Sequence, residues 1–343
     1  MNKSKPENIA SIFSNFEKIS SDFSYQKLNS GHINQSFWVQ NNQRKFILQK
    51  INASVFKNLE IITENIRCVS SHLKSRNYPH FILESLPFSD GSFLWDETWR
   101  LLNYAEKTMT FEKVKSPEQA YEAAKFLGEF HWYLRDLDTN KLKDSIPEFL
   151  DFNSRFQNFK SSLKSASEGR LKISENEIEF LLSHEDILEN WNEISSKLPE
   201  RIIHADPKIS NFLFEVNSSE KIKALIDWDT LMKGTILYDF GDMVRSYTNF
   251  REEDDPGFGE NFSLGNYKAL KKGFLYHLEN QLYPIEKENM DLAGKLVVYI
   301  QAIRFLTDYL NGDIYYQIHY PEQNLNRTKN QIHLLKEMLE KLD

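Results

Sequence analysis

The 343-residue sequence lacks several features that would point to particular classes of protein. It contains one cysteine, Cys68, so an internal disulfide is excluded and a reducing compartment is favoured. No apolar run reaches the roughly 18 residues that a membrane span needs. Residues 1–10 are polar and lack the apolar segment of a signal peptide, so we expect a cytoplasmic protein.

An excess of positive charge is also missing, because 42 Lys and Arg residues are set against 50 Asp and Glu residues. The formal net charge of −8 argues against a nucleic-acid partner, whose phosphates would need a basic face. The 40% of hydrophobic and 27% of charged residues are typical of a soluble globular protein with an ample core.

The most informative segment of the chain runs from His204 to Asn211, and Asp227 follows it sixteen residues later. Phosphoryl transfer is catalysed mainly by positioning and charge neutralisation, and it needs a base for the attacking hydroxyl and oxygen ligands for magnesium. Asp206 is the candidate base, and Asn211 with Asp227 are the candidate metal ligands. Lys208 is placed to reach the transferred phosphate and spread its charge. His204 is predicted to hold the loop through its imidazole.

This motif has an ordinary structural alternative, because an Asp before a Pro in a loop is most often a turn residue. Its surroundings favour the catalytic interpretation. Apolar runs predict strands at 201–204, 211–214 and 224–226, so the loop and Asp227 both fall at strand ends. In protein kinases, an Asn follows the catalytic Asp at the same interval of five residues.

A strand-rich first part of the chain precedes a helix-rich second part. Strands are predicted at 36–39, 45–49, 81–83 and 99–104, with a turn at 41–43 that joins the first two into a hairpin. Helices are predicted from apolar periodicity at 1–24, 56–74, 116–136, 150–165 and 174–197, and from 237 onward. The candidate base and metal ligands belong to the helix-rich part.

Polar residues near the candidate site have more than one interpretation. Asp229 either joins the metal ligands, pairs with Lys208 or has a structural role. Asp239 is predicted to cap a helix. Arg304 and Asp308 are polar exceptions on an apolar helix at 295–310. They form either an internal ion pair or a wall that binds a hydroxyl-rich substrate.

Together these residues resemble the superfamily of aminoglycoside phosphotransferases and choline kinases, and within it the N-acetylhexosamine 1-kinases. The matching segments are 31–37, 46–52, 65–66, 204–214, 226–230, 238–242 and 304–310. The resemblance implies an α+β, protein-kinase-like fold, with a small antiparallel-sheet lobe at 1–104 and a larger, mainly helical lobe at 105–343. It also implies ATP and Mg²⁺ as cofactors and a sugar hydroxyl, the anomeric one of an N-acetylhexosamine, as acceptor.

The same resemblance implies where the nucleotide binds. Gly31, His32 and Asn34 lie in a loop before the hairpin that either covers the phosphates with backbone N–H groups or is simply a turn. Asn103 and Tyr104 would form the hinge that contacts adenine.

One departure from the superfamily pattern concerns the third strand, where Gln49 stands in the position usually filled by a lysine. Lys50 follows it on the opposite strand face. Glu60 and Glu64 lie off the apolar stripe of the next helix, so the usual Lys–Glu ion pair is absent if Gln49 faces the nucleotide.

The acceptor and even the activity have alternatives at this stage. The same machinery would serve choline, homoserine or an aminoglycoside, although cationic acceptors would want an acidic, aromatic pocket. The substitution at Gln49 favours a third possibility, a nucleotide-binding module without turnover. Intact Asp206, Asn211 and Asp227 argue against that module.

Overall fold

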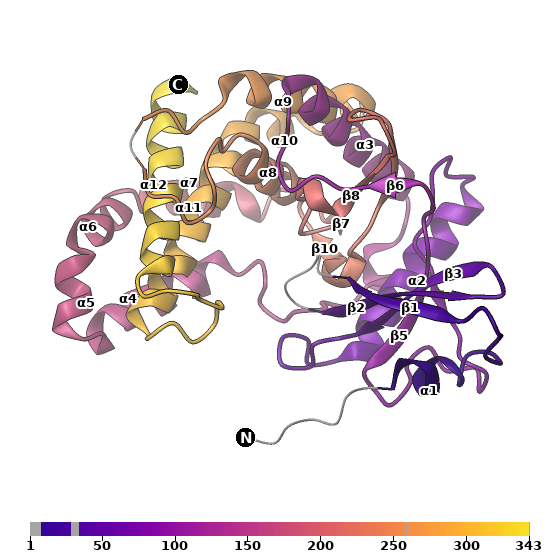
Figure 1. Ribbon diagram of the computed structural model, residues 1–343. Coiled ribbons are helices and arrows are strands. Elements are labelled where there is room, and N and C mark those ends of the chain that lie inside the picture. Colours follow the sequence, from indigo (N-terminus) through magenta and orange to yellow (C-terminus); the bar gives the residue numbers. More distant parts are fainter. Residues whose placement is uncertain (1–7, 29–33, 258, 343) are drawn as a thin grey trace.

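The computed structural model describes residues 8–28, 34–257 and 259–342, and an antiparallel sheet lies beside a larger helical body (Figure 1). The sheet has the strand order β1-β2-β3-β5-β4. Its strands are β1 (Ser24–Leu28), β2 (Gln35–Asn41), β3 (Arg44–Lys50), β4 (Ser85–Leu86) and β5 (Trp99–Asn103). The predicted α+β arrangement of a two-lobe, kinase-like protein is confirmed.

The β2–β3 hairpin turns at Asn42 and Gln43, inside the predicted turn, and both residues have positive φ angles of 50° and 63°. Two successive left-handed residues match the right-handed twist of the paired strands. The register places Ser36 opposite Gln49, and successive side chains along each strand point to opposite faces. One face of the sheet is therefore apolar, while the other presents polar groups to the helical body.

The apolar face of the sheet is covered by α1 (Ile9–Phe13) and by the segment that follows it. The sequence predicts one amphipathic helix over 1–24. Of the described residues 8–24, those of Ile9–Phe13 are helical, and the prediction is wrong from residue 14 onward. Ile12, Phe16 and Ile19 all pack against the sheet, although the last two are not helical. Apolar spacing thus indicated burial correctly but missed β1, which lies at the sheet edge with mostly exposed residues.

Helices dominate the chain after β5, and one long helix, α2 (Leu59–Ser75), lies between β3 and β4 in sequence. The later helices are α3 (Pro117–Leu134), α4 (Phe152–Ser165), α5 (Glu168–Ile173), α6 (Glu175–Ser183), α7 (Asp186–Ser195), α8 (Ile236–Tyr247), α9 (Leu264–Leu278), α10 (Pro284–Glu288), α11 (Met290–Leu310) and α12 (Gln323–Lys341). The single helix predicted at 174–197 is divided into α6 and α7. Among the described residues, no helix combines the length and apolar character that crossing a membrane requires.

Short strands in the helical body position the predicted motif. They are β6 (Thr108–Met109), β7 (Arg201–Ile203), β8 (Phe212–Glu215), β9 (Ile222–Leu225) and β10 (Met232–Gly234). β8 pairs with β9 and β6, while β7 pairs with β10. The strand predicted at 81–83 is not formed, and β4 begins at Ser85 instead.

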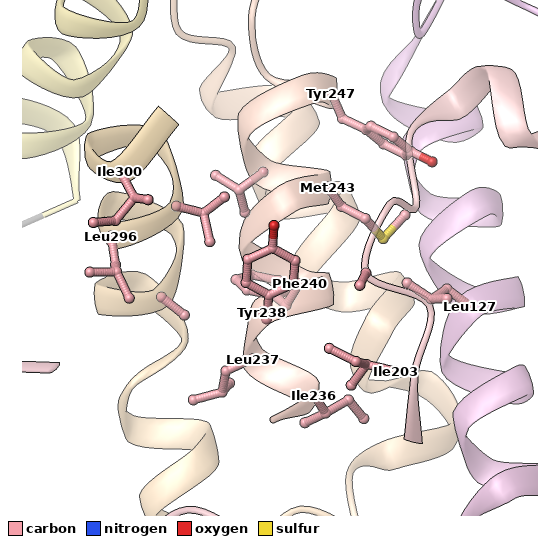
Figure 2. Close-up of a cluster of buried hydrophobic side chains, with 14 of the residues drawn as sticks. Leu127, Ile203, Ile236, Leu237, Tyr238, Phe240, Met243, Tyr247, Leu296 and Ile300 are labelled. Atoms are coloured by element: carbon pink, nitrogen blue, oxygen red, sulfur yellow. The ribbon is translucent and has the colours of Figure 1, made fainter. Parts of the chain in front are cut away.

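Helix α8 runs through the centre of the large core (Figure 2). Leu296 and Ile300 of α11 approach it from one side, and Leu127 of α3 and Ile203 of β7 approach it from the other. Close packing on several sides leaves α8 little freedom, so the polar groups that it carries are held in place. Residues of α2 belong to the same core, which therefore crosses residue 104, and the lobe boundary there stays a prediction.

Candidate active site

The loop between β7 and β8 carries the predicted motif, and a buried carboxylate fixes its start. Asp239 of α8 accepts the backbone N–H of His204 at 2.8 Å and that of Ala205 at 2.7 Å. His131 of α3 approaches the same carboxylate, with Nε2 3.0 Å from Oδ2. Ala205 has a φ of 64°, a strained conformation for a residue other than glycine, and such strain is typical of functional sites.

The role predicted for Asp239 is therefore corrected. The helix begins at Ile236 and is capped by Thr235, whose side chain accepts the N–H of Leu237. Asp239 lies inside the first turn, is fully buried, and clamps the catalytic loop instead of capping the helix. An acid flanked by Leu237, Tyr238 and Phe240 is the signal that could have identified it, because a buried carboxylate needs partners.

The imidazole of His204 links the loop to the end of β9. Its Nε2 lies 2.9 Å from the carbonyl of Ile226, and its Nδ1 lies 3.3 Å from the backbone N–H of Asp206. These contacts require a proton on Nε2 and a free lone pair on Nδ1. Burial lowers the pKa of His204, which agrees with a neutral ring that orients the loop and exchanges no proton.

The candidate base Asp206 is reachable and is flanked by donors. Its side chain is 27% exposed, and the Nζ of Lys208 lies 2.7 Å from Oδ2. The amide of Asn211 donates to the carbonyl of Asp206 at 2.8 Å and to its carboxylate at 3.2 Å. Burial lowers the pKa of Lys208, but attraction to Asp206 and Asp227 outweighs it and raises the pKa overall, so the ammonium stays charged.

Asp227 lies just beyond β9 and turns into the site through a left-handed conformation with φ 64° and ψ 56°. The backbone N–H of Ile226 donates to the carbonyl of Asn211 at 2.9 Å, so the two candidate metal ligands lie on joined segments. Burial, and then the neighbouring charge of Asp229, raise the pKa of Asp227 to about 7. The site therefore contains more negative charge than its own cations neutralise, and an added cation would be favoured.

This donor set fits a magnesium ion that arrives with a nucleotide. The described residues include no group of three or more His, Cys, Asp or Glu side chains placed to hold a metal. Asn211 and Asp227 would supply two oxygens, since the contacts of Asn211 use its amide nitrogen and not its oxygen. Mg²⁺ commonly takes one or two protein oxygens and fills its other positions with phosphate and water.

Asp229 binds Arg100 of the sheet and Asn34, the residue just before β2. Its Oδ1 lies 2.6 Å from Arg100 of β5, and its Oδ2 accepts a hydrogen bond from Asn34 at 2.7 Å. Of the alternatives for Asp229, the structure supports the structural role, because both contacts join the metal-ligand loop to the sheet. Gly31 and His32, predicted with Asn34 to cover the phosphates, lie outside the described residues.

Gln49 is on the sheet face that meets the helical body, and Lys50 is on the opposite face, with its Nζ 5.6 Å from the ring centre of Trp99. The amide of Gln49 donates to Ser36 at 2.8 Å and accepts from Arg100 Nε at 2.9 Å. The side chain predicted to contact the nucleotide is thus engaged in holding an arginine from the adjacent strand.

The helix after β3 also departs from the usual kinase arrangement. Glu60 is exposed, and Glu64 pairs with Lys143 at 3.0 Å on the surface. Asn65 points inward instead, and its amide donates to the carbonyls of Lys143 at 2.7 Å and Leu231 at 3.0 Å. Helix α2 is therefore attached to the helical body through an amide, as well as through its apolar stripe.

The predicted hinge residues follow directly from β5. The side chain of Asn103 donates to the carbonyl of Ile82 at 2.8 Å and accepts from the N–H of Glu84 at 2.8 Å. It therefore extends the sheet toward the segment that precedes β4. Since this amide is engaged, any contact of Asn103 or the half-buried Tyr104 with adenine would fall to the backbone or to the tyrosine ring.

Arg304 and Asp308 lie on α11 as predicted, but they have separate partners. The carboxylate of Asp308 accepts three backbone N–H groups of residues 314–316 at 2.7–2.9 Å and the amide of Asn324 at 2.8 Å. Arg304 donates to Gln301 at 2.9 Å, and its guanidinium lies 5.7 Å from the ring centre of Tyr316. Asp308 therefore shapes the loop that bears Tyr316, and we reassign it from direct substrate contact to positioning.

A small antiparallel sheet beside a larger helical body, with a candidate base and candidate metal ligands on adjoining loops, fits an enzyme that transfers phosphoryl groups to hydroxyls. The chain belongs to the phosphotransferase enzyme family, APH, which it matches over residues 24–272. It is thus a phosphotransferase.

Solved structures share this fold over nearly the whole chain. A microcompartment-associated aminopropanol kinase is 15% identical, with a TM-score of 0.68 and coverage of 97% of this chain and 96% of that one. A choline kinase from Cryptosporidium parvum Iowa II is 17% identical, with a TM-score of 0.59 and coverage of 97% and 96%. A spectinomycin phosphotransferase, in complex with ADP and spectinomycin, is 10% identical, with a TM-score of 0.61 and coverage of 96% and 97%.

Loss of the clamp should loosen the catalytic loop. We expect Asp239→Asn to lower the free energy of unfolding by about 1–3 kcal/mol, because an amide hydrogen would face a buried N–H that needs an acceptor. Displacement of the base should also lower kcat by up to about 100-fold. Urea unfolding and initial rates measure the two effects.

The matched control is Asp186→Asn, which changes an exposed acid in the first turn of α7. It should leave stability and rate close to those of the unchanged protein. Equal effects of the two substitutions would show that the clamp contributes nothing specific.

Proposed function

We propose that the protein transfers the γ-phosphate of ATP, with Mg²⁺, to a hydroxyl of a small sugar, the anomeric hydroxyl of an N-acetylhexosamine being the leading candidate. The observation that carries this proposal is the partly exposed carboxylate of Asp206 between Lys208 and Asn211. A base that accepts a hydroxyl proton and a cation beside the transferred group are what in-line transfer requires.

In the proposed reaction, Asp206 orients the acceptor hydroxyl and takes its proton as the new oxygen–phosphorus bond forms. The bond between the γ-phosphorus and the β,γ-bridging oxygen breaks, and ADP leaves with that electron pair. Lys208 donates to the transferred phosphoryl oxygens, and Asn211 with Asp227 would hold the metal. Mg²⁺, when bound, neutralises charge on the phosphate oxygens.

The preference for a neutral or anionic acceptor rests on the charge beside the base. The charges of both Asp206 and Arg304 act on the buried hydroxyl of Tyr238, whose pKa is raised by burial and by Asp242. Burial and then repulsion from Arg304 lower the pKa of Arg155 on α4. Two guanidinium groups near one another repel a cationic acceptor and donate hydrogen bonds to hydroxyl and carbonyl oxygens.

Amino alcohols are the second candidate class of acceptor, because the structural neighbours include kinases named for aminopropanol and choline. Arg155 and Arg304 count against a quaternary or primary ammonium group. Gln49 was the main argument for a module without turnover, because it leaves the third strand without a cation. Arg100, which is buried and pairs with Asp229, supplies a positive charge on the same face of the sheet and so counts against that module.

An acceptor panel tests the proposal. Magnesium-dependent release of ADP is measured with N-acetylglucosamine, N-acetylgalactosamine, glucose, choline, ethanolamine, homoserine and an aminoglycoside. We expect the N-acetylhexosamines to react with the highest kcat/KM, and Arg304→Gln to raise their KM about tenfold or more through loss of a charged donor. A higher kcat/KM for choline or an aminoglycoside would overturn the sugar assignment. Binding of ATP without ADP release for any acceptor would favour the module without turnover.

A further inference from the structure

A buried arginine on the sheet lies where the sheet meets the metal-ligand loop. Arg100 of β5 is 1% exposed, although charged side chains are seldom buried so completely. In the sheet register it stands opposite Gln49, which in turn stands opposite Ser36. The three side chains therefore share one face and form a polar row across β2, β3 and β5.

The contacts of Arg100 use only part of its guanidinium. Nε donates to Gln49 at 2.9 Å, Nη2 also contacts that amide oxygen, and Nη2 lies 2.6 Å from Asp229 Oδ1. Nη1 is buried, and within the described part of the chain it has no hydrogen-bond partner. A buried charged donor without an acceptor is costly, so a missing partner with oxygen atoms is expected at this end of the side chain.

The surroundings of Arg100 indicate what that partner is. Arg100 pairs with Asp229, which lies two residues after the candidate metal ligand Asp227, so the guanidinium lies next to the segment where a metal and phosphates would meet. Asp229 is bound by both Arg100 and Asn34, and this bridge fixes the guanidinium between sheet and loop. Planar guanidinium groups suit phosphate oxygens because their N–H groups donate in pairs.

The adjacent strand explains why an arginine would be needed here. In kinases, a lysine on the third strand contacts the α- and β-phosphates. Gln49 occupies that strand position and is neutral, and its side chain is fastened to Ser36 and Arg100. The amide thus holds a cation that enters from the neighbouring strand.

We propose that Arg100 binds the α- and β-phosphates of the nucleotide, in place of a third-strand lysine, and that Gln49 and Asp229 are positioning residues for its guanidinium. The proposal rests on ATP being the phosphate donor. It assigns the nucleotide contact predicted for Gln49 to its neighbour on β5.

Direct binding measurements on the full chain test this assignment without reliance on turnover. Calorimetry gives dissociation constants for ATP, ADP and adenosine, with and without Mg²⁺. We expect Arg100→Met to weaken ATP and ADP by about 10- to 100-fold, the worth of one or two charge-assisted hydrogen bonds. Adenosine, which has no phosphate, should bind within about threefold of its original affinity.

Two further variants separate phosphate binding from a purely structural ion pair. Arg44→Met, on the exposed end of β3 where Arg44 pairs with Glu17, is the matched control and should change no affinity. Gln49→Lys in the Arg100→Met background restores a cation to the third strand and should recover at least about tenfold in ATP affinity. Arg100→Lys keeps the charge without the planar fork and should bind ATP with intermediate affinity.

The outcomes are distinct. If Arg100→Met, or Arg100→Lys where the first fails to fold, leaves the ratio of ATP to adenosine affinity unchanged, Arg100 is only a structural ion pair and the assignment is overturned. If the unchanged protein binds GTP but not ATP, the proposed phosphate donor is wrong. The ratio of GTP affinity to guanosine affinity, compared between the unchanged protein and Arg100→Met, then tests whether Arg100 binds phosphate. If it binds neither nucleotide, both proposals fail together.

Discussion

Replacement of Asp206 by asparagine is expected to lower kcat by about 10²–10⁴-fold, the usual contribution of a positioned general base. Asparagine has nearly the same shape, but it cannot accept the acceptor's proton, and it removes the charge that Lys208 faces at 2.7 Å. The dissociation constant of ATP, measured by calorimetry, should change by less than about threefold, because the role that we propose for Asp206 is toward the acceptor hydroxyl and not toward adenine.

The control for this substitution is Asp90→Asn, which alters an exposed carboxylate in a surface turn far from the catalytic loop in sequence. It should keep both kcat and nucleotide affinity. Should Asp206→Asn turn over at a rate close to that of the unchanged protein, the proton must go elsewhere, and the mechanism given for the loop fails.

The catalytic loop was the part of the site most accessible to sequence reasoning. Asp206, Lys208 and Asn211 lie within six residues, so their spacing alone carries the chemistry, and the structure brings them into hydrogen-bond contact. Asp227 is a candidate from the sequence because it follows an apolar strand, and the structure pairs that strand with the strand after the loop. Local spacing and strand pairing are short-range information, which a sequence shows directly.

The supporting contacts were beyond that reasoning, because they join residues far apart in the chain. Arg100 and Asp229 are separated by more than a hundred residues and meet only when the sheet docks on the helical body. Asp239 supports the loop from a helix that starts after the motif, and its sequence context indicated only a helix start. Hydrophobic periodicity does not predict which acid, far away in the sequence, will pair with a buried arginine.

The predicted fold is right where buried apolar residues belong to a regular helix or strand. It is wrong where buried apolar residues lie in turns, or where a strand has few of them. The β2–β3 hairpin and α2 were located to within a few residues, because one face of each is buried. Residues 14–19 are not helical, yet Phe16 and Ile19 among them are partly buried against the sheet. β1 carries little apolar signal because it is an edge strand, and edge strands are paired on one side only.

The charge balance of the site connects these observations. Asp206, Asp227 and Asp229 place three carboxylates near one another, against Lys208 and Arg100. Burial, and then the neighbouring charge of Asp229, raise the pKa of Asp227, so an added cation beside it would be favoured. If Asp227 holds the metal, as we propose, the acid that lowers stability without ligands is also the acid that activity needs.

Asp227→Asn tests that relation, with a predicted gain in one property and a loss in the other. Asparagine tolerates the left-handed φ of 64° and relieves the repulsion, so the free energy of unfolding without ligands should be equal or higher. Loss of a charged metal ligand should lower kcat by about 10²–10³-fold and raise the Mg²⁺ concentration needed for half-maximal rate.

Asp96→Asn is the matched control for this last substitution, because Asp96 is an exposed aspartate that also has a left-handed φ, of 48°, outside the site. It should leave kcat and magnesium dependence unaltered, which separates the backbone conformation from the loss of a ligand. A destabilised Asp227→Asn protein with normal magnesium dependence would mean that Asp227 is a structural acid, and the metal would then need other ligands. Increased stability together with a higher Mg²⁺ concentration for half-maximal rate would support Asp227 as a metal ligand whose charge lowers the stability of the protein without ligands.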